Sequence, residues 1–110
     1  MKTSELQGVA LDWAVATCEG LDYFEPDIGP MEPEYSTDWS LSGPIIERER
    51  IDVLGMVKGE AGPWTACLRK KDEAPPWRHI TEGPTPLIAA MRCYVQSRLG
   101  DEVEIPEELQ

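Results

Sequence analysis

Apolar side chains recur at intervals of three and four residues in the last third of the chain, as they do along one side of an amphipathic helix. The stripe comprises Ile88, Met91, Val95 and Leu99. Thr85 is a good N-cap residue, Pro86 suits the first helical position, and Gly100 suits the C-terminal stop. The pattern predicts a helix over residues 86–99, with Arg92 facing away from the apolar stripe.

The rest of the pattern predicts two more helices and three strands. Residues 9–19 carry apolar side chains on one helical face, and a proline at position 44 marks the start of a short helix over residues 44–50. Residues 51–57 have strand character, and residues 63–69 alternate between apolar and polar side chains, as in a half-buried strand. Residues 77–80 add one more short strand.

These elements indicate an α+β fold class. We expect a small antiparallel sheet of three to four strands, packed with two main helices at 9–19 and 86–99 and with the short helix near 44–50. Residues 21–38 are rich in proline and acidic side chains and are expected to form a long loop. A chain of 110 residues suits a single domain, and its acidic tail, 101–110, is expected to pack poorly.

Composition narrows the class of protein. Apolar residues make up 41% of the chain, which is enough for one core. No stretch approaches the roughly 18 apolar residues that a membrane-spanning helix needs. Residues 1–6 lack the apolar segment of a signal peptide. We therefore expect a cytoplasmic location and no membrane partner.

The net charge of −11 is unevenly distributed. Residues 1–38 hold nine acids and one base, residues 101–110 hold five acids and no base, and the centre is close to neutral. Binding to the phosphate backbone requires clustered lysine and arginine, so we expect no direct contact with nucleic acid. We expect the acidic flanks mainly to keep the protein soluble. Contact with a basic protein is the next alternative, and mimicry of DNA is the least favoured.

Candidate catalytic residues are few. His79 is the only histidine, and although Cys67 lies in a neighbouring predicted strand, no third residue orients such a pair. The sequence has no phosphate-binding loop, dinucleotide fingerprint or calcium loop. The cysteines at 18, 67 and 93 are widely spaced, so we expect buried free thiols, no metal site and no cofactor. We predict that the protein is not an enzyme.

Tryptophan and arginine provide the best binding chemistry in the sequence. Core packing is the usual role of tryptophan, but Trp39 precedes the predicted start of a helix, where free N–H groups can bind an anion. Aromatic rings stack on bases, and arginines bind phosphate groups. The predicted ligand site comprises Ser36, Thr37, Asp38, Trp39, Arg48, Trp64 and Arg92.

Three blocks of sequence carry a family resemblance. They lie at residues 2–6 and 10–16, at 35–39 and 43–49 (Tyr-Ser-Thr-Asp-Trp and Gly-Pro-Ile-Ile-Glu-Arg-Glu), and at 83–92 and 99–103. In this order the blocks resemble small phage and prophage proteins of the NinX type. The resemblance implies a non-structural accessory protein of a temperate bacteriophage, and it implies no particular activity.

Two hypotheses of function follow. The first is a non-enzymatic accessory protein that binds a small nucleotide-like ligand or a host factor. Its sharpest form is counter-defence, in which the protein sequesters a nucleotide-derived immune signal in the host cytoplasm. The second is a protein–protein inhibitor or adaptor whose acidic flanks contact a basic host protein. The sequence leaves the oligomeric state open, a homo-oligomer included.

Overall fold

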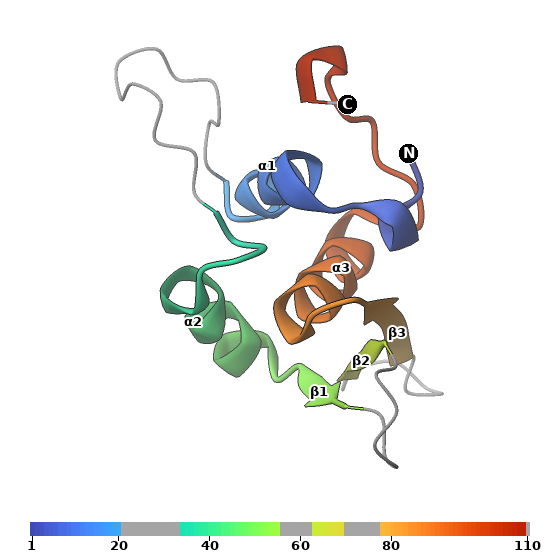
Figure 1. Ribbon diagram of the computed structural model, residues 1–110. Helices are drawn as coiled ribbons and strands as arrows, with labels where there is room; N and C mark the ends of the chain where they lie inside the picture. Colours follow the sequence, from blue (N-terminus) through green and yellow to red (C-terminus); the bar gives the residue numbers. More distant parts are fainter. Residues whose placement is uncertain (21–33, 56–62, 70–77, 110) are drawn as a thin grey trace.

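The computed structural model describes residues 1–20, 34–55, 63–69 and 78–109. Its elements are η1 (Thr3–Glu5), α1 (Gly8–Cys18), α2 (Trp39–Glu49), β1 (Asp52–Leu54), β2 (Trp64–Arg69), β3 (Arg78–Gly83), α3 (Pro86–Leu99) and η2 (Glu107–Leu109). Helix α3 lies at the centre, surrounded by α1, α2 and the sheet (Figure 1). The predicted α+β fold class is confirmed.

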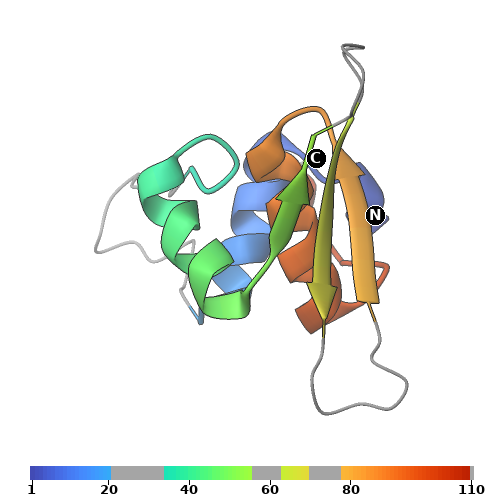
Figure 2. The same cartoon turned by 90° about the horizontal axis from the view of Figure 1, so that it is seen from below.

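The sheet is antiparallel, with strand order β1-β2-β3. Ala66 of β2 lies opposite Val53 of β1 and Thr81 of β3, and both Ala66 and Thr81 are buried. Because side chains alternate along a strand, this face of the sheet points toward α3 (Figure 2). Leu54 and Ile80 lie on the opposite face and are exposed. The sheet is therefore covered by a helix on one face.

Helix α3 has the predicted bounds. The Oγ1 atom of Thr85 accepts a hydrogen bond of 3.1 Å from the backbone N–H three residues later, and Pro86 is the first helical residue. The predicted one-sided stripe is wrong, because Leu99 is 39% exposed and Arg92 only 9%. Because α3 has neighbours on several sides, it buries residues around most of its circumference: Leu87, Ala89, Ala90, Met91, Arg92, Cys93, Tyr94 and Val95.

Helix α2 begins earlier than the short helix predicted at 44–50, and it runs from Trp39 to Glu49. Asp38 caps it, since its Oδ1 atom accepts a hydrogen bond of 2.9 Å from the N–H of Ser40. The sequence prediction relied on the preference of proline for the first turn. Pro44 lies instead in the helix interior, where the preceding glycine lacks the Cβ that would clash with the proline ring.

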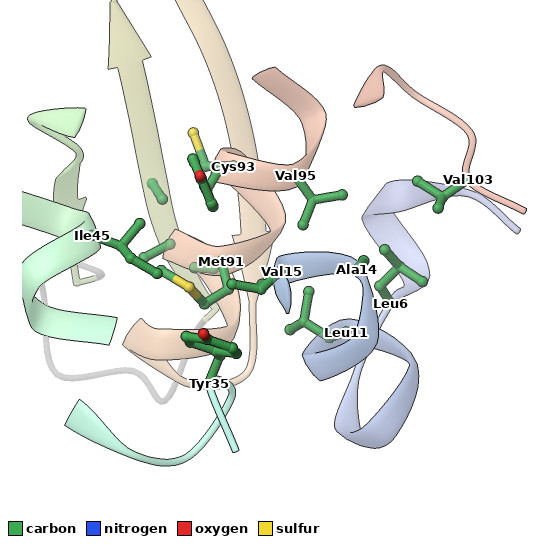
Figure 3. Packing of buried hydrophobic residues seen from close by; sticks show 14 of the residues in the cluster. Leu6, Leu11, Ala14, Val15, Tyr35, Ile45, Met91, Cys93, Val95 and Val103 are labelled. Atoms are coloured by element: carbon green, nitrogen blue, oxygen red, sulfur yellow. The ribbon is translucent and has the colours of Figure 1, made fainter. Parts of the chain in front are cut away.

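Met91 joins the three helices in the core. Its side chain lies between Val15 of α1 and Ile45 of α2, with the ring of Tyr35 beside it (Figure 3). All four side chains are buried. Apolar burial of this kind is the main stabilising contribution to a fold of this size. Helix α1 matches the predicted helix at 9–19 with a shift of one residue.

The two ends of the described chain pair with each other. The Met1 amino group donates to the Val103 carbonyl at 3.0 Å, and the Val103 N–H donates to the Met1 carbonyl at 2.9 Å. Val103 and Ile105 are buried, and Val103 lies beside Leu6 (Figure 3). The expectation that the tail packs poorly is therefore wrong for residues 101–109, because its two apolar side chains alternate with acids that remain exposed.

Some sequence predictions lie outside the described residues. These are most of the loop expected at 21–38, the last part of the strand expected at 51–57, and the start of the strand expected at 77–80. In the part of the chain that the structure describes, none of the helices is both long enough and apolar enough to cross a membrane.

Candidate functional site

The structure distributes the seven predicted site residues over three places. Residues 36–39 lie at the start of α2, Arg48 lies near its end, and Trp64 and Arg92 line a groove beside β3. A helix rises 1.5 Å per residue, so Trp39 and Arg48 are separated by about 13 Å along α2. Of the seven, Trp64 and Arg92 line the groove, and the other five do not line it.

The start of α2 is a completed cap. Asp38 Oδ1 accepts hydrogen bonds from both the N–H and the hydroxyl of Ser40, at 2.9 and 2.6 Å, and these bonds hold the pKa of Asp38 below its ordinary value. The N–H of Ser36 donates to Asp12 Oδ1 at 2.8 Å and attaches the turn to α1. Trp39 is 54% exposed and directly follows the Asp38 carboxylate. The helix start that the sequence placed at residues 43–44 thus lies inside α2, and at the actual start the N–H of Ser40 binds a carboxylate of the chain itself.

Arg48 belongs to a polar network at the C-terminal ends of the three α-helices. Its Nη1 and Nη2 atoms donate to the two carboxylate oxygens of Glu19, at 3.1 and 2.8 Å, and its Nε donates to Glu49 at 3.0 Å. The hydroxyl of Tyr94 donates to Glu19 at 2.6 Å, and Arg98 donates to Glu49 at 3.0 Å. Both guanidinium groups also lie over the Tyr94 ring, 5.8 and 5.5 Å from its centroid.

The network stabilises the charged forms of its carboxylates. The hydrogen bond from Arg48 is the largest cause that lowers the pKa of Glu19. Burial alone would raise the pKa of Glu49, but hydrogen bonds from Arg48 and Arg98 outweigh it, and the pKa is lowered. Arg48 therefore pairs with two carboxylates, one of which it shares with Arg98, and these contacts connect the ends of the helices.

A groove of about 900 Å³ runs beside β3. Its lining comes from the edge strand and the turn after it (residues 80–84), from η1 (Ser4), from α3 (Arg92 and Gln96), and from the start of β2 (Pro63 and Trp64). β3 is the last strand of the sheet, and the N-terminal segment lies next to it (Figure 2). The groove therefore follows an edge of the sheet.

Arg92 is the charged group inside this groove. Its Nε donates to the carbonyl of Leu6, and its Nη1 donates to the carbonyl of Glu82, both at 2.7 Å. The ion pairs within the described residues all involve Arg48 or Arg98, and none involves Arg92. Burial lowers the pKa of Arg92, in line with a cation that is removed from water without a carboxylate beside it. Nη2 has no hydrogen-bond partner among the described residues.

Trp64 provides an apolar surface at one end of the groove. An added Cβ on Gly55 would lie 3.0 Å from Cζ3 of Trp64, so the indole ring leans over Gly55, the residue that follows the neighbouring strand β1. The residue is 36% exposed. Of the predicted site residues, Trp64 and Arg92 are thus the two that line one groove, although the indole leans toward β1 and Arg92 contacts β3.

Cys67 and His79, the candidate nucleophile and base, do not lie next to each other in the sheet. His79 lies opposite Leu68 in the β2–β3 register, whereas Cys67 lies opposite Ile80. Directly opposite residues share a face of the sheet, so His79 and Cys67 are on different faces. Of the three thiols, Cys93 is buried, and burial raises its pKa to about 12. The other two are partly buried, so the expectation of buried thiols holds fully for Cys93 alone.

Of the groove residues, sequence reasoning identified Trp64 and Arg92 and missed the others, among them Ser4, Ile80 and Gln96. No local motif marks them, because they come from three elements whose proximity depends on which strand forms the edge of the sheet. The end-to-end pairing of the chain places Ser4 there, and it involves residues about 100 positions apart.

The fold and the groove define a class of protein, a small α+β domain with an open groove that contains a buried arginine. Within the described ranges, no three histidine, cysteine or acidic side chains are placed to hold a metal ion. The profile of the family described as "Bacteriophage P22, NinX" matches residues 2–98. The chain therefore belongs to the NinX family and is a phage accessory protein, and the family resemblance of its three sequence blocks is confirmed. No curated protein matches the chain.

Proposed function

We propose that this phage accessory protein is a non-enzymatic binding protein that holds an anionic group of its target at Arg92. One observation carries the proposal: a guanidinium in a 9% exposed residue lines an open groove and has no carboxylate partner among the described residues. The two carbonyls that it contacts fix its position, and they leave Nη2 without a partner from the described chain.

Electrostatics supports an anion at this place. Removing a guanidinium from water costs free energy that an opposite charge offsets. Hydrogen bonds between arginine and a carboxylate or phosphate are charge-assisted and stronger than bonds to neutral carbonyls. An anionic group should therefore bind more strongly to Arg92 in the groove than to Arg48, which lies outside the groove and already pairs with two carboxylates.

Two kinds of target fit the phage context. A small nucleotide-like ligand, such as a nucleotide-derived immune signal, would place a phosphate on Arg92 and its base against the apolar end of the groove near Trp64. A host protein would present a carboxylate side chain or chain end to the same guanidinium. In either case the accessory protein acts by sequestration or blocking, with no bond made or broken.

The side-chain Nε–H signals of arginine in the ¹⁵N-labelled full chain test the proposal directly. Acetate, inorganic phosphate and AMP would be titrated separately while the signals of Arg92, Arg48 and Arg98 are followed. We expect the Arg92 signal to shift with at least one of these anions. Arg48 and Arg98 serve as internal controls in the same sample, because carboxylates of the chain already neutralise them. A saturating titration in which Arg92 moves no more than the two controls would overturn the proposal.

An Arg92→Lys variant provides the second readout. Lysine keeps the positive charge but lacks the planar fork that reaches two carbonyls and an anion together. We expect an anion affinity at least about tenfold weaker than in the wild type. Circular dichroism would establish that the variant is folded, and unchanged affinity in a folded variant would remove Arg92 from the proposed site.

A second candidate function is binding to a basic host protein. It is favoured by the docked tail, where Glu102 and Glu104 are exposed on a segment anchored by the buried side chains of Val103 and Ile105. A variant with Glu102→Gln and Glu104→Gln, compared with the wild type in cross-linking from infected cells, should lose a basic partner. Recovery of the same partners at the same yield would eliminate this function.

A further inference from the structure

The groove also contains part of an unpaired strand edge. In an antiparallel pair, the N–H and C=O of one residue point to the same side, and successive residues alternate. The carbonyl of Glu82 accepts a hydrogen bond from Arg92, which lines the groove beside this edge, so Glu82 faces away from β2. The carbonyl of His79 accepts from the buried thiol of Cys93, which does not line the groove, and by alternation His79 faces β2. Ile80, two positions earlier, faces the same way. No described residue donates to or accepts from the backbone of Ile80 on that side.

This edge is chemically suited to another extended backbone. A free row of N–H and C=O groups on an edge strand is a template for strand addition, and folded proteins usually cover it or interrupt it with charge. Here the Arg92 side chain covers the Glu82 carbonyl, whereas the edge at Ile80 borders the groove and has no backbone partner outside the sheet among the described residues. The Ile80 side chain is 55% exposed, which gives an added strand an apolar neighbour.

Charge decides between a peptide and a highly charged ligand. Arg92 offers one positive charge without a carboxylate partner, in a chain whose net charge is −11. A terminal carboxylate carries one negative charge and matches it, whereas a polyphosphate would bring several charges into a negative field. A nucleotide also leaves the strand edge unused, because it has no alternating backbone donors and acceptors.

We propose that the groove binds the C-terminal end of an extended peptide, which adds to β3 at Ile80 and places its terminal carboxylate on Arg92. This inference rests on the proposed function, since it names the target of the same anion site. Arg92 contacts Glu82, which follows Ile80 in the strand, so the peptide runs from Ile80 toward Glu82 and is parallel to β3. The partner is therefore a protein with an accessible, extended C-terminus.

A peptide array tests the carboxylate. Random octapeptides would be synthesised on one array with free C-termini and on a second array as C-terminal amides, and both would be probed with the full chain. We expect binders whose affinity falls at least about tenfold on amidation, because the amide removes the charge that Arg92 recognises. Equal binding of free and amidated peptides, or no binder with a free carboxylate, would overturn the inference.

Two substitutions at Ile80 test strand addition with the best free-carboxylate peptide. Ile80→Pro removes the N–H that faces away from β2, so the ladder with β2 keeps its bonds while the added strand loses one. Ile80→Thr is the matched control, since it keeps the N–H and strand propensity and removes apolar surface. We expect about tenfold loss for I80P and less than about threefold for I80T. Equal affinities of the two variants would rule out pairing at Ile80.

NMR separates failure of this inference from failure of the proposed function, and it does not depend on whether I80P folds. With the free peptide, the amides of Ile80 and Glu82 and the Nε–H of Arg92 should shift in the wild-type chain. If phosphate or AMP moves Arg92 and no peptide does, the peptide inference is wrong and the anion site stands. If neither anions nor peptides move Arg92, both proposals are wrong.

Discussion

At the scale of single residues, two positions show how neighbours far apart in sequence decide a role. Helical spacing predicts Arg92 on the solvent side of its helix, yet Arg92 is buried and connects α3 to β3 and to the residue after η1 through two carbonyls. Gly83 precedes a proline in the sequence, and it is buried at the point where β3 meets α3. The spacing of residues within one helix cannot show either contact, because each contact is made with a different element of the fold.

Replacing Gly83 by alanine should destabilise the protein by about 1–3 kcal/mol, the usual cost of overpacking. The added Cβ would lie 2.7 Å from the backbone nitrogen of Ala89 and 3.0 Å from its Cα, and backbone atoms of a buried helix cannot move aside cheaply. Urea unfolding of the variant and the wild type measures the difference in free energy of unfolding.

Gly55→Ala is the matched control for Gly83→Ala. Its added Cβ would meet the Trp64 ring at 3.0 Å, but that ring is partly exposed and can turn away. We expect a loss below about 1 kcal/mol. If the two variants were equally stable, the close approach of β3 and α3 would not be a packing constraint.

At the scale of elements, α2 shows a conflict between local signals. Asp38 caps the helix at Trp39, while Gly43 and Pro44 favour a boundary five residues later. The helix begins at the Asp38 cap because tertiary contacts fix the residues on both sides of the Gly-Pro pair. Before the pair, the buried hydroxyl of Ser42 donates to the Tyr35 carbonyl, and after it Ile45 packs in the core. By contrast, all signals agree for α3, and its bounds were predicted correctly.

Pro44→Ala should therefore stabilise the protein, by about 2 kcal/mol. Alanine restores the N–H that an interior helical residue donates and removes the ring from the path of the preceding turn, although the unfolded chain also gains freedom. Pro86→Ala is the control, because Pro86 is the first residue of α3, where no N–H is needed, and it should change stability by less than about 1 kcal/mol. Thermal unfolding of both variants compares them, and a P44A variant no more stable than the wild type would show that α2 carries no strain at proline.

At the scale of the whole molecule, polar contacts connect the ends of the three α-helices to one another and connect the first residues of the chain to the tail. The carboxylates of Glu19 and Glu49 hold the C-terminal ends of α1, α2 and α3 together through Arg48 and Arg98. The termini are joined by backbone hydrogen bonds between Met1 and Val103. These contacts predict how the stability of the whole fold responds to acid.

Stability should decrease as the pH falls below the ordinary carboxyl value of 4.5. Arg48 lowers the pKa of Glu19, and hydrogen bonds from Arg48 and Arg98 outweigh the burial of Glu49, so the folded state binds fewer protons than the unfolded state in this range. The contribution is therefore present above 4.5 and is lost as the pH falls through the lowered values.

The variant Glu19→Gln tests the origin of this acid sensitivity. Its Tm should be lower than that of the wild type near neutral pH, and it should fall less steeply in acid, because one of the lowered pKa values is absent. The exposed Glu104→Gln serves as the control and should follow the wild-type curve. A wild-type acid slope retained in E19Q would place the sensitivity elsewhere in the chain.

The sequence by itself determined the properties that depend on residues close together in the chain. Thr85, Pro86 and Gly100 set the ends of α3, alternation indicated β2, and three blocks of sequence indicated the family whose profile matches residues 2–98. Net charge follows directly from composition, and motif spacing follows from the order of the residues. These signals are local, since a cap, a strand alternation and a motif each act within a few residues.

Only the tertiary structure decided where the groove lies and which residues it contains. Ser4, Ile80 and Arg92 meet because β3 is the edge strand and because the two ends of the chain pair beside it. The same assembly neutralised Arg48 with two carboxylates and left Arg92 without one among the described residues. The sequence shows which charges exist, but burial and long-range contacts determine which of them are compensated, and that difference is what makes Arg92 the candidate site.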